Sequence, residues 1–472
     1  MRFVFVFLIS ASLCANLAAQ SGRANPTGTP TVSTVAAELS IKQMFEEANG
    51  YNKAKFAEFE QKKIAYSESL RLATERAQRQ LAAKYATSAA TRANLSGEDI
   101  YFIGLLNWIA ENYDATTASL TKFLESPDQK PERTQNARSI LVFVFAKQKK
   151  FDEALKHLAD YEAGGATKVS DRWRMNSELA KSYIATKDHA KALIHATKAY
   201  EAAKALLKDP TSKVNSADAV LDSGMLVFEI NRDLGKIKEA DAALIEMRDT
   251  ATTVNSPVFF YYAADKLITY QIETGRKTAG LETYLSSLIL AGKSFAARGP
   301  DNEALTRLKR REKQYKLLMD PAPELVGMEQ WFPGTPKTLA SLKGKVVLLD
   351  FWATWCGPCF DAFPALQEWH QDLSSEGLVI IGLTRYYGRA DGMAADQPSE
   401  IAFLKRFKEK QKLDYDFAVA DDPITQNVYG GTSLPTTVLI DRKGIVRYIE
   451  SGTNPTRIEE LRAMMIKLLA EK

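Results

Sequence analysis

Cysteine is scarce in this chain of 472 residues, which contains only three. The first, Cys14, falls within residues 1–19, where an apolar stretch from Phe3 to Leu13 leads to small residues ending at Ala19, as in a secretory signal peptide. Cleavage after Ala19 removes Cys14 and leaves two cysteines, three positions apart, in the mature chain. This excludes a framework of structural disulfides, which in exported proteins distributes more cysteines over the domains.

The N-terminal segment has two further interpretations. Residues 3–19 could stay attached as a membrane anchor, although the apolar stretch is shorter than the roughly 20 residues that span a bilayer. Cys14 could instead carry a lipid, although Leu13 differs from the small residue expected before a lipidated cysteine. We expect a cleaved signal and export to the bacterial periplasm, with anchoring through residues 3–19 as the alternative.

Histidine, long apolar runs and excess charge are also lacking. Only His370 of the four histidines lies in the region of the two remaining cysteines, whereas a structural zinc site takes about four Cys or His ligands. We therefore expect no metal and no cofactor. The net charge of +4 gives no case for nucleic acid as a partner. No segment after the signal has the uninterrupted run of about 18 apolar residues that a second membrane helix requires.

Composition divides the rest of the chain into three zones. Residues 20–35 are rich in Ser, Thr, Pro and Gly and are expected to form a disordered tether. Residues 36–318 have few prolines, many Ala, Leu, Lys and Glu, and helical spacing of apolar residues. Pro321 and Pro323 end this pattern, and strand-like segments follow. We predict a multidomain chain, with an all-α domain at 36–318 and an α/β domain at 322–472.

A weak internal repeat runs through the helical zone. Short turns precede helices expected to begin at Tyr113, Phe151, His189, Ile237 and Lys277, with steps of 38, 38, 48 and 40 residues. Each start places a small residue three positions later, where two helices could cross closely. This pattern resembles the tetratricopeptide repeat, which has a period of about 34 residues and stacks helix pairs into a solenoid. The resemblance implies a surface that docks a partner protein or substrates; a spacer or dimerisation module is the alternative.

Strand-like and helical segments alternate in the C-terminal zone. The nearly continuous apolar strands fit a central sheet covered on both faces. We expect strands at 345–351, 378–383, 417–420, 436–440 and 445–451, and helices at 360–373, 399–410 and 457–470.

The two remaining cysteines lie in Trp355-Cys356-Gly357-Pro358-Cys359, directly after the first of these strands. A helix N-terminus carries partial positive charge and free N–H groups, so it stabilises a thiolate at Cys356. Gly357 and Pro358 keep the loop compact and give the helix a fixed start. A C-x-x-C pair in this position is suited to dithiol–disulfide exchange, with Cys356 as the attacking thiol and Cys359 as the resolving thiol.

The stretch from Leu349 to Cys359 resembles the active site of thioredoxin-like proteins. Residues 339–345 and 434–437 resemble the exported TlpA/ResA-type thiol–disulfide oxidoreductases, and the resemblance covers the C-terminal domain only. It implies a thioredoxin-like fold, a redox-active Cys356–Cys359 disulfide, protein disulfides as substrates and a membrane partner as the electron donor.

The resemblance also assigns roles to residues outside the motif. Asp350 corresponds to a buried acid that accepts the proton of Cys359, the alternative being a surface residue at the end of the strand. Pro435 corresponds to a cis proline facing the cysteines, and Leu434 would offer its backbone N–H and C=O to an extended substrate; an ordinary trans proline is the alternative. Trp352 and Trp355 are expected to shield the dithiol, with core packing as the alternative for Trp352.

Two departures from the family pattern concern the surroundings of the motif. Many exported relatives carry a glutamate three positions after the second cysteine, where this chain has Ala362 beside Asp361. The stretch 386–398 is longer than expected between a strand and its helix, and could be a lid, a substrate-contact loop or a surface loop.

The expected function is that of an exported thiol–disulfide oxidoreductase whose helical region docks a partner or substrate. The Gly-Pro dipeptide resembles that of thioredoxin, with a potential of about −270 mV, so we expect reduction of substrate disulfides. One alternative is a helical-repeat scaffold with a vestigial thioredoxin domain. Another is a thiol peroxidase of the related peroxiredoxin group, although Cys356 lacks the Pro-x-x-x-Thr/Ser-x-x-Cys context of those enzymes.

Overall fold

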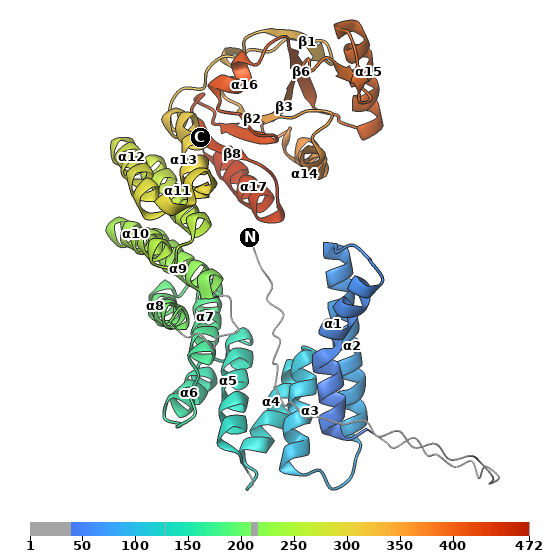
Figure 1. Cartoon of the computed structure of the whole chain (residues 1–472), viewed down its shortest axis with the longest axis vertical. Helices are drawn as coiled ribbons and strands as arrows, with labels where there is room; N and C mark the ends of the chain where they lie inside the picture. Colours follow the sequence, from blue (N-terminus) through green and yellow to red (C-terminus); the bar gives the residue numbers. More distant parts are fainter. Residues whose placement is uncertain (1–38, 128, 209–215, 472) are drawn as a thin grey trace, which may run out of the picture. The chain divides into compact units, whose positions relative to one another are not determined.

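The computed structural model describes residues 39–471, except 128 and 209–215 (Figure 1). The predicted signal peptide at 1–19, with Cys14, and the predicted tether at 20–35 lie outside these residues. The described part of the chain divides into two compact units, and the division in the sequence falls between Leu234 and Gly235. Secondary structure changes from helices to strands later, between Leu317 and Met328. The division into functional domains at 318–322 remains a prediction.

The described part of the first unit consists of helices that pack on the next helix of the chain or on the one after it. They are α1 (Ile41–Gln61), α2 (Glu68–Ala90), α3 (Gly97–Ile109), α4 (Tyr113–Leu124), α5 (Pro131–Lys147), α6 (Phe151–Glu162), α7 (Val169–Ala185), α8 (His189–Leu206) and α9 (Ser216–Asp233).

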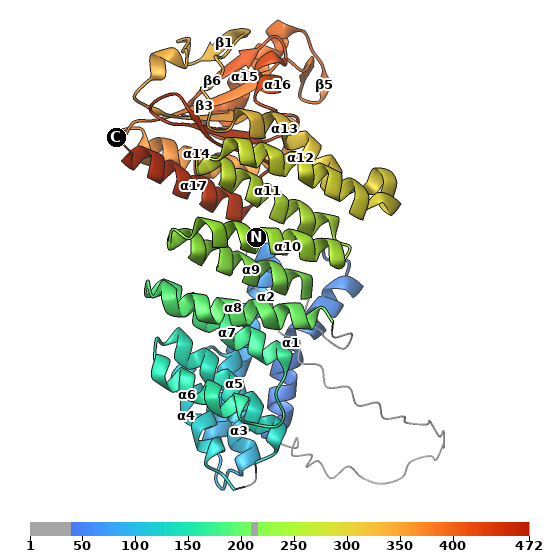
Figure 2. The same ribbon diagram turned by 90° about the vertical axis from the view of Figure 1, so that its left-hand side faces the viewer.

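The second unit begins with four helices that continue the same pattern (Figure 2). These are α10 (Ile237–Thr253), α11 (Pro257–Glu273), α12 (Lys277–Ser294) and α13 (Glu303–Leu317), with a short 3-10 turn at Ala296–Asp301. None of the helices in the described ranges has the length and apolarity required to cross a membrane.

Five helices begin at the residues where the repeat predicted them, namely α4, α6, α8, α10 and α12. The small residue three positions into each is buried, as expected where two helices cross closely: Thr116, Ala154, Ala192, Ala240 and Gly280. At the last of these, an added Cβ would lie 2.6 Å from Cγ1 of Ile272 on α11, so only glycine fits. The identification of these pairs as tetratricopeptide-like repeats is a proposal.

A residue with left-handed backbone precedes each of these five helices by two positions. The residues are Glu111, Lys149, Lys187, Gly235 and Gly275, with φ from 58° to 80°. This conformation reverses the chain between paired helices, and it is unfavourable for every residue with a Cβ. Glycine occupies it in two of the five turns.

The remainder of the second unit is a six-stranded mixed sheet with the order β1-β6-β3-β2-β7-β8. Strand β2 lies at the centre, parallel to β3 and antiparallel to β7. The strands are β1 (Met328–Phe332), β2 (Val346–Phe351), β3 (Leu378–Arg385), β6 (Asp416–Ala420), β7 (Thr436–Ile440) and β8 (Val446–Ser451); β4 (Arg389–Ala390) and β5 (Met393–Ala394) form a separate hairpin.

Helices α14 (Gly357–Leu373), α15 (Gln397–Gln411) and α17 (Pro455–Ala470) contribute to one apolar core with the sheet. Alternate residues of β2, such as Val346 and Leu348, point into this core together with Trp352. Figure 1 shows α14 and α17 on the same side of the sheet. On β2, Phe351 belongs to the other set of alternating residues and packs on Tyr429, which follows the short helix α16 (Ile424–Val428).

Several elements of the sheet region differ from the prediction. Strand β1, helix α16 and the β4–β5 hairpin were not predicted, because their sequences are short and lack a clear apolar period. Helix α14 begins at Gly357 rather than at 360, so Gly357, Pro358 and Cys359 belong to its first turn. A short 3-10 turn at Ala340–Leu342 precedes β2.

The edge strand β8 is covered by residues from outside the sheet. Backbone hydrogen bonds join Met319 N–H to Val446 and Ala322 N–H to Gly444, each at 2.8 Å. Further along the same strand, Arg311 of α13 donates from Nη1 to the carbonyl oxygen of Ile449 at 2.7 Å. An uncovered edge strand presents unpaired backbone groups to other chains. Here the end of the helical region covers them.

Candidate active site

The cysteine pair lies where β2 gives way to α14. Cys356 is the N-cap residue of α14, and Gly357 and Pro358 are its first two helical residues. The Sγ atoms of Cys356 and Cys359 are bonded at 2.03 Å, with their Cα atoms 5.4 Å apart. The pair therefore sits at the positive end of a helix dipole, where a thiolate is stabilised.

Side-chain exposure differs sharply within the motif. Cys356 is only 4 % exposed and Cys359 is fully buried, whereas Gly357 and Pro358 face solvent. Cys356, the predicted attacking thiol, is thus almost fully shielded from solvent in this disulfide form. Trp355 is 58 % exposed, so it borders the disulfide without covering it. Trp352 is buried and stacks on Phe407. It therefore packs in the core, which was the alternative to shielding the dithiol.

Asp350 is the buried acid beneath the pair. It lies six residues before Cys356, on β2, and is 1 % exposed. Neither of its carboxylate oxygens has a hydrogen-bond partner among the described residues. Burial raises the pKa of Asp350 to about 7; the Thr437 hydroxyl opposite it on β7 makes no regular hydrogen bond to the carboxylate, but its polar interaction lowers this pKa in part. Asp350 can therefore gain or lose a proton near neutral pH.

On strand β3, the residue paired with Asp350 is Gly382. Because glycine has no side chain, it leaves room for two aromatic side chains. A Cβ at Gly382 would lie 2.9 Å from Nε1 of Trp352 and 3.4 Å from Cε2 of Tyr415. Burial, followed by the charge of Asp350, raises the pKa of the Tyr415 hydroxyl well above its usual range. Asp350 thus has aromatic neighbours on this side, which fits its raised pKa.

The peptide bond between Leu434 and Pro435 is cis. This bond directly precedes β7, whose first residue, Thr436, pairs with Phe351 at the C-terminal end of β2. Because the cysteines follow that same end of β2, Pro435 lies at the end of the strands that also carries the cysteine pair. The Pro435 carbonyl oxygen accepts a hydrogen bond of 2.7 Å from Gly452 N–H. Leu434 is half-buried against the core.

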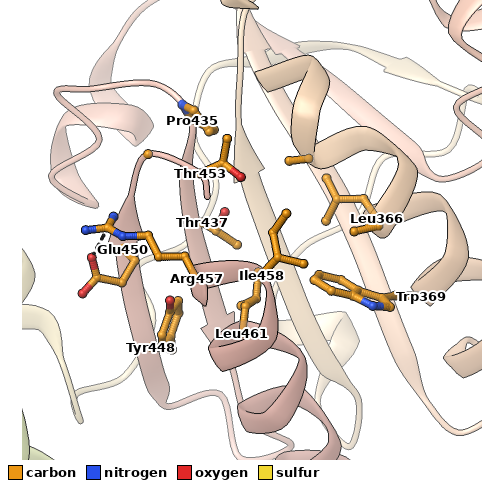
Figure 3. Close-up of a pocket in the computed structure, with 13 residues that line it drawn as sticks. Leu366, Trp369, Pro435, Thr437, Tyr448, Glu450, Thr453, Arg457, Ile458 and Leu461 are labelled. Carbon is orange, nitrogen blue, oxygen red and sulfur yellow. Dashed lines mark ion pairs between the residues drawn. The ribbon is translucent and has the colours of Figure 1, made fainter. Parts of the chain in front are cut away.

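The positions after the second cysteine lack a buried acid. Asp361 is exposed and Ala362 is half-buried. Ala362 lines a cavity of about 20 Å³ between α14, α17 and strands β7 and β8 (Figure 3). Pro435, Thr437 and Glu450 line the same cavity. Sequence reasoning missed Glu450, because nothing local links β8 to the motif.

The long stretch 386–398 begins beside the motif. The ring of Tyr387 meets that of Trp355 edge to face, with centroids 5.3 Å apart, and the guanidinium of Arg385 lies 4.3 Å from the Tyr387 ring centroid. Glu400 of α15 accepts hydrogen bonds from the backbone N–H groups of Tyr387 and Gly388 at 2.8 and 2.9 Å. This end of the stretch is therefore anchored at the active site.

Comparison with known proteins agrees with this geometry. Residues 319–465 match the family model Redoxin. The chain is 33 % identical over 145 residues to Protein DipZ of Mycobacterium bovis, covering 29 % of this chain and 19 % of DipZ. It is 32 % identical over 123 residues to the thiol-disulfide oxidoreductase ResA of Bacillus thuringiensis, covering 26 % of this chain and 64 % of ResA. It therefore spans less than two thirds of either relative.

Among solved structures, a putative thiol:disulfide interchange protein DsbE from Chlorobium tepidum is 29 % identical, with 32 % of this chain and 98 % of that chain covered and a TM-score of 0.26. The family match covers the sheet, the cysteine pair and most of α17. The C-terminal part of this chain is a Redoxin domain of thioredoxin-like type, related to the ResA-type thiol–disulfide oxidoreductases.

Proposed function

We propose that this protein is a thiol–disulfide oxidoreductase that reduces disulfides in other proteins through Cys356 and Cys359. The observation that carries the proposal is the bonded cysteine pair at a helix N-terminus, which follows the strand β2 that holds the buried carboxyl of Asp350. The Redoxin match and the ResA relative support the same reaction class.

In the first step, the thiolate of Cys356 attacks one sulfur of a substrate disulfide. A mixed disulfide forms between Cys356 and the substrate, and the other substrate sulfur leaves as a thiolate that takes a proton from solvent. The N-terminal end of α14 favours the Cys356 thiolate, because the helix dipole places partial positive charge at the position that Cys356 occupies.

In the second step, Cys359 passes its proton to the Asp350 carboxylate and attacks Sγ of Cys356. The Cys356–Cys359 disulfide forms, and the second substrate sulfur is released as a thiolate that is protonated by solvent. Two electrons thus move from the dithiol to the substrate. Asp350 suits the role of base because burial raises its pKa to about 7, close to the pH at which it has to exchange protons.

The substrate is proposed to lie across the cis proline. An extended segment can pair with the backbone of Leu434 before Pro435, while the exposed ring of Trp355 contacts the residues around the substrate disulfide. Export through residues 1–19, a membrane electron donor and docking of a partner or substrate on the helical region complete the proposal, with membrane anchoring through residues 3–19 as the alternative.

Trapping tests the proposal directly. In a Cys359→Ser variant the second step is blocked, so Cys356 should remain joined to natural substrates, which mass spectrometry after non-reducing electrophoresis identifies. The double variant Cys356→Ser/Cys359→Ser is the matched control and should trap nothing. The absence of trapped proteins in both reducing and oxidising cells would favour the scaffold alternative. A reduction potential near about −120 mV would contradict reduction as the direction.

A further inference from the structure

A row of polar side chains crosses the sheet beneath the redox site. Asp350 of β2 lies directly opposite Thr437 of β7, and Thr437 lies directly opposite Glu450 of β8. Residues directly opposite one another in antiparallel strands point to the same face, with Cβ atoms about 4.5 to 5.5 Å apart. The three side chains are therefore consecutive neighbours on the face that α14 and α17 cover.

The row continues beyond the sheet into α13 and α17. Glu450 Oε1 lies 2.8 Å from Nη2 of Arg311, and Glu450 Oε2 lies 3.1 Å from Nη1 of Arg457. Nε of Arg311 lies 3.0 Å from Oδ1 of Asp265 on α11. Because the Arg311 side chain is only 8 % exposed, these contacts hold the Glu450 carboxylate in a fixed position.

The middle of the row opens into a cavity. Thr437 and Glu450 both line the cavity of about 20 Å³ under Pro435, and Figure 3 shows Thr437 between Glu450 and the α14 side of that cavity. Such a volume accommodates about one water molecule beside polar groups. The Glu450 side chain is 18 % exposed, whereas Asp350 is 1 % exposed. Glu450 is therefore the carboxyl of the row that reaches solvent.

Asp350 needs such a route, because it must release a proton before it can accept another from Cys359. We propose that Glu450 exchanges this proton with solvent, that the Thr437 hydroxyl links the two carboxyls, and that Arg311 and Arg457 position Glu450. This inference rests on the proposed function. Protonated Asp350 donates to the Thr437 oxygen while the Thr437 hydroxyl donates to Glu450, and Glu450 then releases the proton to water. No electrons move in this step.

The charges around Glu450 are compatible with this role. Burial raises the pKa of Glu450, Arg311 and Arg457 lower it, and Asp265 and Glu460 raise it, with a net rise. The pKa values of the two carboxyls in the row thus both lie above those of exposed carboxyls, which favours proton transfer between them. The titratable groups around the row are Tyr261, Asp265 and Glu273 on α11, Arg311 on α13, Arg457 and Glu460 on α17, Tyr448 on β8, and Tyr415 beside Asp350.

The test follows the two steps of a single turnover with a chromogenic aromatic disulfide, which releases one coloured thiolate in each step. Stopped-flow traces of the reduced protein from pH 5 to 9 give both rates. In Glu450→Gln and Thr437→Val, the second step should slow by about tenfold or more below pH 7, where Asp350 is mostly protonated. The first step should be unchanged. Thr437→Ser keeps the hydroxyl and should restore the rate.

Two control variants distinguish an effect of the polar row from a general effect on packing or surface charge. Thr453→Val alters the same cavity outside the row, and Glu459→Gln removes an exposed carboxylate of α17. Both should match the wild-type protein. An unchanged second step in Glu450→Gln and Thr437→Val, or equal slowing in Thr453→Val, would overturn the inference. If Glu450→Gln does not fold, Thr437→Val against Thr437→Ser decides alone, since both keep the ion pairs. Trapping with Cys359→Ser tests the proposed function separately: if it captures no substrate, the function is wrong, whereas both rates of thiolate release stay measurable in the wild-type protein.

Discussion

At the scale of single residues, the proposed chemistry depends on one carboxyl that the fold keeps away from water. Asp350 is buried with no hydrogen-bond partner for its oxygens among the described residues. Its protonated form is therefore favoured in the folded protein, and this has a consequence for stability that does not depend on any substrate.

Replacing Asp350 by Asn should stabilise the oxidised protein in a pH-dependent way. Because the folded pKa of about 7 lies above the ordinary value of 3.8, the folded protein binds more protons than the unfolded chain between these pH values. The free energy of unfolding of the wild-type protein therefore falls as pH rises through this window, by up to about 4 kcal/mol. Urea unfolding of Asp350→Asn and wild type should agree near pH 4 and diverge at pH 8.

Asp361→Asn is the matched control for that measurement, since Asp361 is an exposed aspartate of the neighbouring helix turn. It should leave the pH dependence of unfolding unchanged. Equal unfolding free energies of Asp350→Asn and the wild type at pH 8 would mean that the Asp350 carboxyl is not desolvated as the structure indicates.

The residues of the motif could be assigned from sequence, but their surroundings could not. The C-x-x-C spacing after an apolar strand located Cys356 and Cys359, because these features are local, and the resemblance to thioredoxin-like proteins singled out Asp350. The neighbours Gly382, Tyr415 and Glu450 come from three other strands or their ends. Their position follows from strand register, which is a long-range property of the folded sheet.

At the scale of elements, turn geometry sets the start of each paired helix. The sequence located the starts of α4, α6, α8, α10 and α12, because a turn followed by a small residue recurs in each copy. It did not predict the left-handed residue two positions earlier, since Glu111, Lys149 and Lys187 occupy that position without being glycine. It also missed β1, α16 and the β4–β5 hairpin, which are stabilised by tertiary contacts rather than by a local period.

Alanine substitutions at two glycines should have opposite effects on stability. Gly275 has a φ of +80° in the turn before α12, so Gly275→Ala should lower the free energy of unfolding by about 1 kcal/mol. Gly292 lies inside α12 with open space at its Cβ position, so Gly292→Ala should raise it by about 0.5 to 1 kcal/mol. Chemical denaturation of both variants checks the pair. A stabilising effect of Gly275→Ala would show that the turn is not held in the left-handed conformation.

At the scale of the whole molecule, the helical region and the Redoxin domain are joined by more than a linker. The second compact unit contains α10 to α13 together with the sheet, and the ion pairs of Asp265, Arg311 and Glu450 connect the two parts. Composition placed the change from helices to strands near Pro321. It could not show these ion pairs, because Arg311 and Glu450 are separated by 139 residues in the sequence.

Removing Arg311 should destabilise this unit strongly. Arg311→Met leaves the carboxylates of Asp265 and Glu450 without their shared cation in a buried site, which should lower the free energy of unfolding by about 3 to 5 kcal/mol. Arg310→Met, at the exposed position one residue earlier in α13, should change it by less than about 0.5 kcal/mol. Thermal and urea unfolding of the mature protein compare the two. Equal stability of both variants would show that the ion pairs contribute little.

The residues that cover β8 affect how the C-terminal domain would behave without the helical region. A fragment that begins after residue 322 exposes the edge that Met319, Ala322 and Arg311 otherwise cover, and it leaves Glu450 without its α13 partner. Such an edge is a template for strand exchange between copies. The end of the helical region therefore shields this strand edge from pairing with other copies of the chain, a role that requires no docked partner.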